Sequence, residues 1–149
     1  MVITTIAVIA IDGLFPKELT LTMLAEVTKM IRGIKFASIP VNDQDKAIAF
    51  YTEKLGFRIM TDQPFNEKQR WVELGIPGAE TRVVLFKFDN SLQPGIQMNV
   101  SFWTDDVEGT VRDLKAKGVK ITMEPKKADW GECAAFQDID GNNFIVGSK

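Results

Sequence analysis

The side chains of this chain that could do acid–base, nucleophilic or metal chemistry are few, because its 149 residues include no histidine and a single cysteine, Cys133. Histidine is the commonest transition-metal ligand and the usual general base near neutral pH. Its absence excludes, within this chain, Ser-His-Asp and Cys-His nucleophiles, HExxH zinc sites and the iron site of two histidines and a carboxylate. We do not expect Cys133 to be catalytic, since no histidine can activate it and small buried cysteines are usually packing residues.

The composition indicates a soluble globular domain and limits its partners. A net charge of −2 provides no cationic field, so neither DNA nor RNA is an expected partner. The lone cysteine excludes an intrachain disulfide framework and is typical of a reducing compartment, so we expect a cytoplasmic protein. The apolar run at residues 2–11 is far shorter than a membrane span and follows no basic segment, so we expect neither a membrane partner nor a signal peptide.

Residues 1–32 precede the part of the chain with a repeating pattern. Leucine, methionine and valine recur at mostly helical spacing in residues 18–30, and Gly33 would end a helix there. Two interpretations stay open. The segment is either a helix that packs on the domain, or a dispensable N-terminal extension that is not native.

From residue 34 onward the chain reads as two similar halves, at about residues 34–88 and 97–149. Each half predicts strand, helix and three further strands, a βαβββ unit. The expected strand, helix and strand lie at residues 34–41, 45–54 and 57–61 in the first half, and at 98–104, 107–117 and 119–123 in the second. The last two strands follow at 71–74 and 82–86, and at 133–136 and 143–147. The sequence therefore predicts an α+β domain built by duplication.

Local signals at equivalent positions support this duplication. Asp43 and Asp106 precede the two helices and can cap their free N–H groups. Gly56 and Gly118 follow the helices and can adopt the left-handed conformation that ends them. A four-stranded sheet with one helix leaves its other face uncovered, so we expect the two units to curve together around a shared cavity.

Four motifs in this pattern carry a resemblance to a known family. They are IPVND at residues 39–43, AFYTEKLGF at 49–57, DDV at 105–107 and DIDGN at 138–142. Together they resemble the vicinal oxygen chelate superfamily of glyoxalases, bleomycin-resistance proteins and extradiol dioxygenases. The resemblance covers residues 33–149 and implies a cup-shaped fold that is commonly paired in a homodimer, with cups that can form across the dimer.

Metal-using relatives take their ligands from the first and last strands of each half. The resemblance places these positions at Phe36, Val84, Asn99 and Ile145 in this chain. Three are hydrocarbon, and one neutral amide cannot hold a divalent metal that needs three or four good donors. We therefore expect no metal and no other cofactor.

The same positions fix which residues should line the cup, because strand side chains alternate between the two faces of a sheet. The expected ligand-binding residues are Phe36, Ser38, Trp71, Glu73, Arg82, Asn99, Trp103 and Trp130. Phe36, Trp71 and Trp103 are candidates for stacking on a flat ligand, although they could simply fill the cup. Trp130 precedes a strand, where it is either a lid over the pocket or an ordinary turn anchor.

Glu73 and Arg82 carry the charges of this lining. Charges that face a partly closed cavity are costly unless they are paired with each other or with a ligand. They could form a structural ion pair. Alternatively, Glu73 is a general base whose pKa is raised by burial, and Arg82 binds a ligand carboxylate or phosphate. If the strand is flipped, both point to solvent.

We favour a metal-free binding protein of the bleomycin-resistance type, which sequesters a small hydrophobic or aromatic molecule without converting it. The first alternative is an enzyme: a lyase or dioxygenase with displaced metal ligands such as Glu73, or an isomerase that uses Glu73 as base. The second is an interaction module whose cup is filled by its own side chains.

Overall fold

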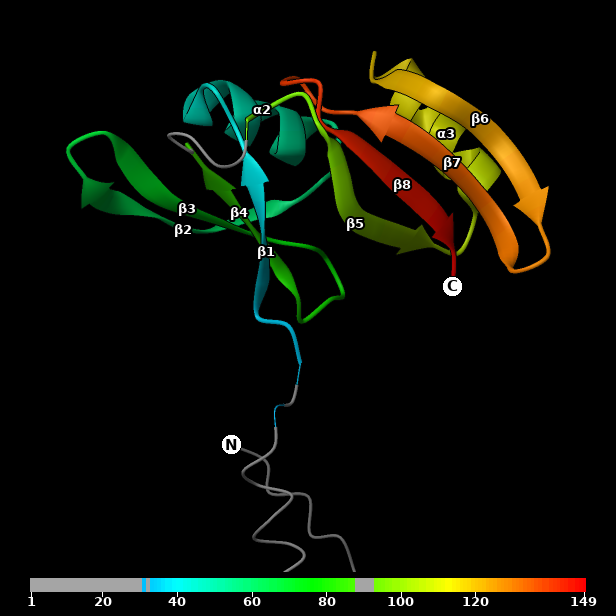
Figure 1. The fold of residues 1–149 in the computed structure, drawn as a ribbon, viewed down its shortest axis with the longest axis horizontal. Helices are drawn as coiled ribbons and strands as arrows, with labels where there is room; N and C mark the ends of the chain where they lie inside the picture. The colour runs from blue at the N-terminus through cyan, green and yellow to red at the C-terminus, as the bar shows by residue number, and fades with distance from the viewer. Residues whose placement is uncertain (1–30, 32, 88–92) are drawn as a thin grey trace, which may run out of the picture. The chain divides into compact units, whose positions relative to one another are not determined.

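The computed structural model of the protein describes residues 31, 33–87 and 93–149, and residues 34–149 form one compact unit. This unit contains two βαβββ halves, as the sequence predicts (Figure 1). The interpretations of residues 1–32 fall on residues that, apart from Ile31, lie outside the described part of the chain. No helix within the described residues is long and apolar enough to cross a membrane.

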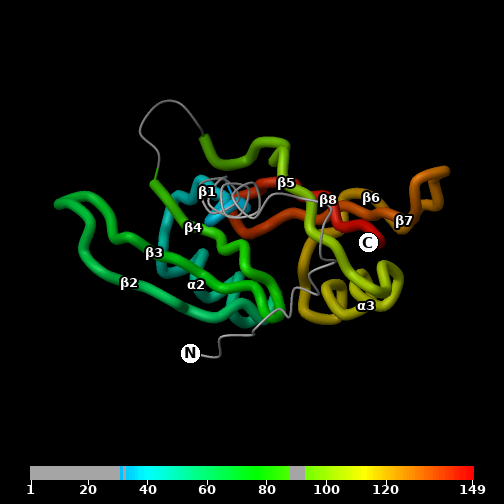
Figure 2. Tube along the Cα trace, turned by 90° about the horizontal axis from the view of Figure 1, so that it is seen from below, coloured from blue at the N-terminus to red at the C-terminus, as the bar shows by residue number. Residues whose placement is uncertain are grey.

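The first half forms a four-stranded sheet with one helix. Its elements are β1 (Phe36–Pro40), α2 (Gln44–Glu53), β2 (Arg58–Asn66), β3 (Gln69–Gly75) and β4 (Arg82–Phe86). The strand order is β1-β4-β3-β2, which can be followed in Figure 2. The β1–β4 pair is parallel and the other pairs are antiparallel.

The second half repeats this arrangement. Its elements are β5 (Gln97–Thr104), α3 (Val107–Ala116), β6 (Lys120–Ala128), β7 (Gly131–Gln137) and β8 (Asn143–Ser148). The strand order β5-β8-β7-β6 is equivalent to that of the first sheet, with β5 and β8 parallel. The duplication read from the sequence is thus confirmed in topology as well as in element order.

Both helices begin and end where the local signals predict. The Asp43 carboxylate accepts hydrogen bonds from the backbone N–H groups of Asp45 and Lys46, and Asp106 accepts one from Gly109. After the helices, Gly56 and Gly118 have φ angles of 73° and 77°. These values lie in the left-handed region that glycine enters without steric cost.

The edge strands β2 and β6 are longer than predicted. We expected them to end at Thr61 and Met123, but they continue to Asn66 and Ala128. The added residues are mostly polar and include Pro64 and Pro125, which break the alternating pattern. An edge strand tolerates such residues because one side of its backbone has no partner strand.

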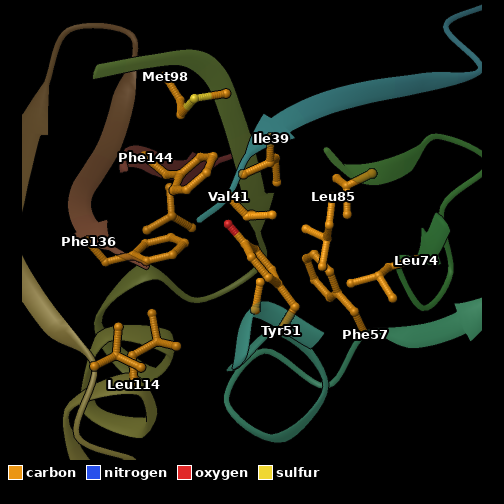
Figure 3. Packing of buried hydrophobic residues seen from close by; sticks show 14 of the residues in the cluster. Ile39, Val41, Tyr51, Phe57, Leu74, Leu85, Met98, Leu114, Phe136 and Phe144 are labelled. Atoms are coloured by element: carbon orange, nitrogen blue, oxygen red, sulfur yellow. The ribbon is translucent and has the colours of Figure 1, made fainter. Parts of the chain in front are cut away.

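One hydrophobic cluster spans both halves (Figure 3). Its fully buried members include Ile39, Tyr51 and Leu74 from the first half and Phe144 from the second. Phe57 meets Phe102 across the junction, with ring centroids 5.9 Å apart. The helix-facing sides of both sheets therefore contribute to a common core.

Hydrogen bonds also join the halves, from α2 and the segment that precedes it to the turn between β7 and β8. The Tyr51 hydroxyl donates to Asp138 Oδ2 at 2.6 Å, and Asn142 Nδ2 donates to the Pro40 carbonyl at 2.8 Å. Asn42 Nδ2 donates to Asp140 Oδ1 at 2.8 Å. The DIDGN motif at residues 138–142 thus supplies contacts between the halves as well as a turn.

Candidate functional site

The outer face of each sheet, which we define as the face opposite its helix, carries the residues expected to line the cup. On the outer face of the first sheet, four aromatic rings form a continuous cluster: Phe36, Phe65, Trp71 and Phe86. Trp71 contacts Phe36 at a centroid distance of 5.5 Å, Phe65 at 5.8 Å and Phe86 at 5.9 Å. Phe65 is 54 % exposed. A flat apolar molecule would therefore find accessible ring surface on this face.

Glu73 lies next to the aromatic cluster and is held from two sides. Arg82 Nη1 donates to Glu73 Oε1 at 2.6 Å, and the Trp71 indole N–H donates to Oε2 at 3.2 Å. Glu73 is only 6 % exposed, whereas the Arg82 side chain is 40 % exposed. The expected ion pair is present, and it also fixes the orientation of the Trp71 ring.

The electrostatics of Glu73 differ from those of a general base with a raised pKa. Burial by itself would raise the pKa of this carboxyl group. The hydrogen bonds from Arg82 and Trp71, together with the positive charges of Arg82 and Lys35, outweigh burial and lower the pKa below its usual value. The raised pKa considered for Glu73 is thus wrong, because its partners stabilise the charged form.

The outer face of the second sheet is more polar and more open. Asn99, Ser101 and Trp103 alternate along β5 and are exposed, with Trp103 at 56 %. Trp103 pairs in register with Gly147 of β8, and Lys149 Nζ lies 4.6 Å from the centroid of the Trp103 ring. Trp103 is therefore a second accessible ring, already engaged on one side by a cation.

Trp130 lies in the turn between β6 and β7 and is 69 % exposed. A Cβ atom placed on Gly147 would meet the Trp130 ring at 3.9 Å, so this ring approaches the same glycine that pairs with Trp103. Cys133 pairs with Gly147 from the other side and is buried. Two exposed indoles thus lie near a floor of small residues.

The positions that metal-using relatives employ do not fit a divalent cation in this chain. Val84 is fully buried, and Ile145 lies between Ser101 and Ala135 in the sheet. Asn99 contributes one neutral amide. The neighbouring carboxylate of Glu73 is already neutralised by Arg82. Across residues 33–87 and 93–149, no group of three histidine, cysteine, aspartate or glutamate side chains could hold a metal ion.

The structure brings together one part of the predicted site and leaves the other part separate. Phe36, Trp71, Glu73 and Arg82 contact one another on the first sheet, and Ser38 lies on the same face, paired in register with Val84. Asn99, Trp103 and Trp130 lie on the second half. Within the described residues, no hydrogen bond, ion pair or ring contact joins these two groups. The core lies between the helix-facing sides of the two sheets, so within the described residues these outer faces do not form the shared cavity that we expected between the halves.

Alternation from Arg82 along β4 also places Phe86 on the outer face, whereas two residues of these faces were missed by sequence reasoning. Phe65 belongs to the part of β2 beyond the predicted end of that strand, and Lys149 is the last residue of the chain. Alternation from Gln63, which pairs with Trp71, would have placed Phe65 on the outer face had the strand been extended. No sequence signal pointed to Lys149.

A family model described as Glyoxalase/Bleomycin resistance protein/Dioxygenase superfamily matches residues 33–146. The chain belongs to this superfamily. The uncharacterized protein YetH of Bacillus subtilis (strain 168) is 36 % identical over 120 residues, which cover 78 % of this chain and 98 % of YetH. Membership in the glyoxalase/bleomycin-resistance superfamily thus accounts for nearly all of the described residues.

Solved structures of the same superfamily are similar over the same region. TnmS3, an antibiotic binding protein from Streptomyces sp. CB03234, is 36 % identical with a TM-score of 0.73, covering 79 % of this chain and 96 % of TnmS3. A superfamily member from Sphaerobacter thermophilus DSM 20745 is 32 % identical with a TM-score of 0.75, covering 80 % and 98 %. The glyoxalase/bleomycin-resistance fold predicted from the sequence is confirmed.

Proposed function

We propose that this protein binds a flat hydrophobic or aromatic small molecule without a metal ion and sequesters it without chemical conversion. The observation that carries this proposal is the accessible cluster of Phe36, Phe65, Trp71 and Phe86 beside an ion-paired Glu73. Stacking on aromatic rings supplies affinity, and the few neighbouring polar groups supply orientation. The similarity to the antibiotic binding protein TnmS3 supports the same function.

The complete binding site requires two copies of the chain. The outer face of the first sheet offers aromatic rings and an ion pair, whereas that of the second offers Asn99, Ser101 and Trp103. Each face is open to solvent on its own and would bury only one side of a ligand, whereas small-molecule sites bury most of the ligand surface. In a two-fold homodimer, the first half of one chain can face the second half of its partner, which creates two equal cups.

The enzymatic alternative has less support. A general base must be able to accept a proton near the working pH, and the pKa of Glu73 lies below its usual value because of Arg82 and Trp71. Both of its carboxylate oxygens accept hydrogen bonds from those residues. A lyase, isomerase or dioxygenase mechanism built on Glu73 would first have to break this arrangement.

Tryptophan fluorescence quenching by a panel of flat aromatic compounds tests the proposal. We expect at least one compound to bind with the same affinity in the presence and absence of EDTA, and to be recovered unchanged when analysed by mass spectrometry. Trp71→Leu should weaken binding at least about tenfold, which corresponds to the loss of about 1.4 kcal/mol of stacking. Ile139→Ala, which shortens an exposed apolar residue in the turn between β7 and β8, is the matched control. Recovery of a modified compound, or loss of binding with EDTA, would contradict the proposal.

A further inference from the structure

A hollow of about 400 Å³ lies on the first half beside the link between β3 and β4. It is separate from the aromatic cluster, and none of the four clustered rings lines it. Its lining residues are Arg58, Met60, Gly75, Ile76, Pro77, Gly78, Ala79, Glu80 and Arg82. The hollow therefore places two positive charges, Arg58 and Arg82, beside the face that we propose for ligand binding.

The strand register places the two arginines on the same face, on either side of a glycine. Arg58 of β2 pairs with Gly75 of β3, and Gly75 pairs with Arg82 of β4. Residues directly opposite one another share a face, and neighbouring strands lie about 4.8 Å apart, so the two arginine Cα atoms are roughly 10 Å apart. Gly75 has no side chain, and the flexible Met60 side chain lies over it, with its sulfur 3.0 Å from a Cβ atom placed on Gly75. Arg58, Met60 and Arg82 all line the hollow, so two extended arginine side chains can converge in it beside the Met60 side chain.

The charges around the hollow leave hydrogen-bond donors available. Arg82 uses Nη1 on Glu73, which orients the guanidinium and leaves its remaining N–H donors without a protein partner in the described part of the chain. Arg58 is exposed and forms no ion pair with any described residue. Lys35 adds a positive charge near Glu73, and Glu80 is the one acidic residue among those that line the hollow.

We propose that Arg58 and Arg82 together bind an anionic group, a carboxylate or a phosphate, of the molecule that the outer face binds. The inference rests on the proposed function and specifies its ligand as a flat aromatic anion. Guanidinium groups bind carboxylates and phosphates through paired, charge-assisted hydrogen bonds. Phe36 pairs in register with Arg82, and its ring contacts Trp71, so an aromatic ring on the cluster can carry its anionic substituent toward the two arginines.

A matched series of probes separates the anion site from the aromatic site. The probes are 2-naphthoate, 2-naphthyl phosphate and the neutral 2-naphthamide, titrated against the full chain at constant ionic strength. We expect wild-type protein to bind at least one of the two anions about tenfold more tightly than the amide. Preference for one anion over the other identifies carboxylate or phosphate as the group. Arg58→Gln should remove most of the preference over the amide and leave the affinity for the amide within about twofold.

Arg112→Gln provides the control, because Arg112 is an exposed arginine of α3 that forms no ion pair with any described residue. It should retain the full preference for anions. Equal binding of the amide and both anions by wild-type protein would overturn the inference and leave the proposed function intact. Failure of all three probes to bind would count against the proposed function. The anion site would then be tested with inorganic phosphate alone. Thermal stabilisation of wild-type protein by phosphate, absent in Arg58→Gln, would support the anion site, and equal melting behaviour of the two proteins would overturn it.

Discussion

The Tyr51 hydroxyl and the Asp138 carboxylate form a buried hydrogen bond of 2.6 Å that joins the two halves of the domain. Burial raises the pKa of Asp138 above its usual value, and the hydrogen bonds from Tyr51 and Asn142 oppose this rise. Burial and the charge of Asp138 together raise the pKa of Tyr51, so this hydroxyl remains a donor across the physiological range. Because each half contributes one partner, this contact helps to fix how the two sheets are oriented.

Removal of the Tyr51 hydroxyl should destabilise the domain. In Tyr51→Phe, the buried Asp138 loses one donor, and we expect the free energy of unfolding to fall by about 1–2 kcal/mol. Urea denaturation measures this change. A double-mutant cycle with Asp138→Asn should give a coupling energy of about 1 kcal/mol or more. A coupling energy near zero would show that the contact does not join the halves energetically.

The ion pair of Glu73 predicts a specific dependence of stability on pH. Its folded pKa is lower than the ordinary value of 4.5, so its contribution is complete above pH 4.5 and is lost as the pH falls through the folded pKa. At pH 7, we expect Glu73→Gln to lower the free energy of unfolding by about 2 kcal/mol, because Arg82 loses its carboxylate. This difference from wild-type protein should shrink below pH 4.5. Asp138 is present in both proteins, so its own titration largely cancels.

Glu67→Gln is the control for this measurement, since Glu67 is exposed and forms no ion pair with any described residue. Its urea denaturation should match that of wild-type protein within about 0.5 kcal/mol at each pH. If the difference between Glu73→Gln and wild-type protein grew as the pH fell, the assignment of a lowered pKa to Glu73 would be wrong.

Gly56 should be intolerant of a side chain for conformational reasons alone. Its φ angle is 73°, and no heavy atom lies within 4 Å of a Cβ atom placed there. Gly56→Ala should therefore cost about 1 kcal/mol from backbone strain, without a steric clash. Gly33→Ala is a suitable comparison, because Gly33 also has open space around it but does not have a positive φ angle. Equal stabilities of the two variants would contradict this account.

The fold could be predicted from the sequence because its signals are local and occur twice. Helix caps at Asp43 and Asp106 and left-handed glycines at Gly56 and Gly118 each depend on a few neighbouring residues. The ends of β2 and β6 could not be predicted in this way. Their outer residues are held in the sheet by pairing with β3 and β7 and have no apolar pattern of their own.

The site was predictable within each sheet but not between the sheets. Alternation correctly placed Phe36, Trp71, Glu73 and Arg82 together, because neighbours on one strand face are fixed by the backbone. How the halves pack depends on contacts such as Tyr51 with Asp138, which are 87 positions apart in the sequence. The balance between burial and hydrogen bonding at Glu73 likewise required the geometry of its partners, since burial alone shifts its pKa in the opposite direction.

We propose that each binding cup combines the first half of one chain with the second half of another. Trp71→Leu and Trp103→Leu variants with different affinity tags can be co-expressed, and the heterodimer can be isolated by tandem purification. Urea denaturation of each variant alone first verifies that it is folded.

The decisive measurement is the stoichiometry with which this heterodimer binds an aromatic probe that wild-type protein binds. We predict about one bound molecule for every two chains, whereas each variant alone should bind with at least about tenfold lower affinity. The heterodimer contains one cup with both tryptophans and one with neither, so half of the sites should be restored. A monomeric protein, or a heterodimer that binds no better than either variant alone, would contradict the account.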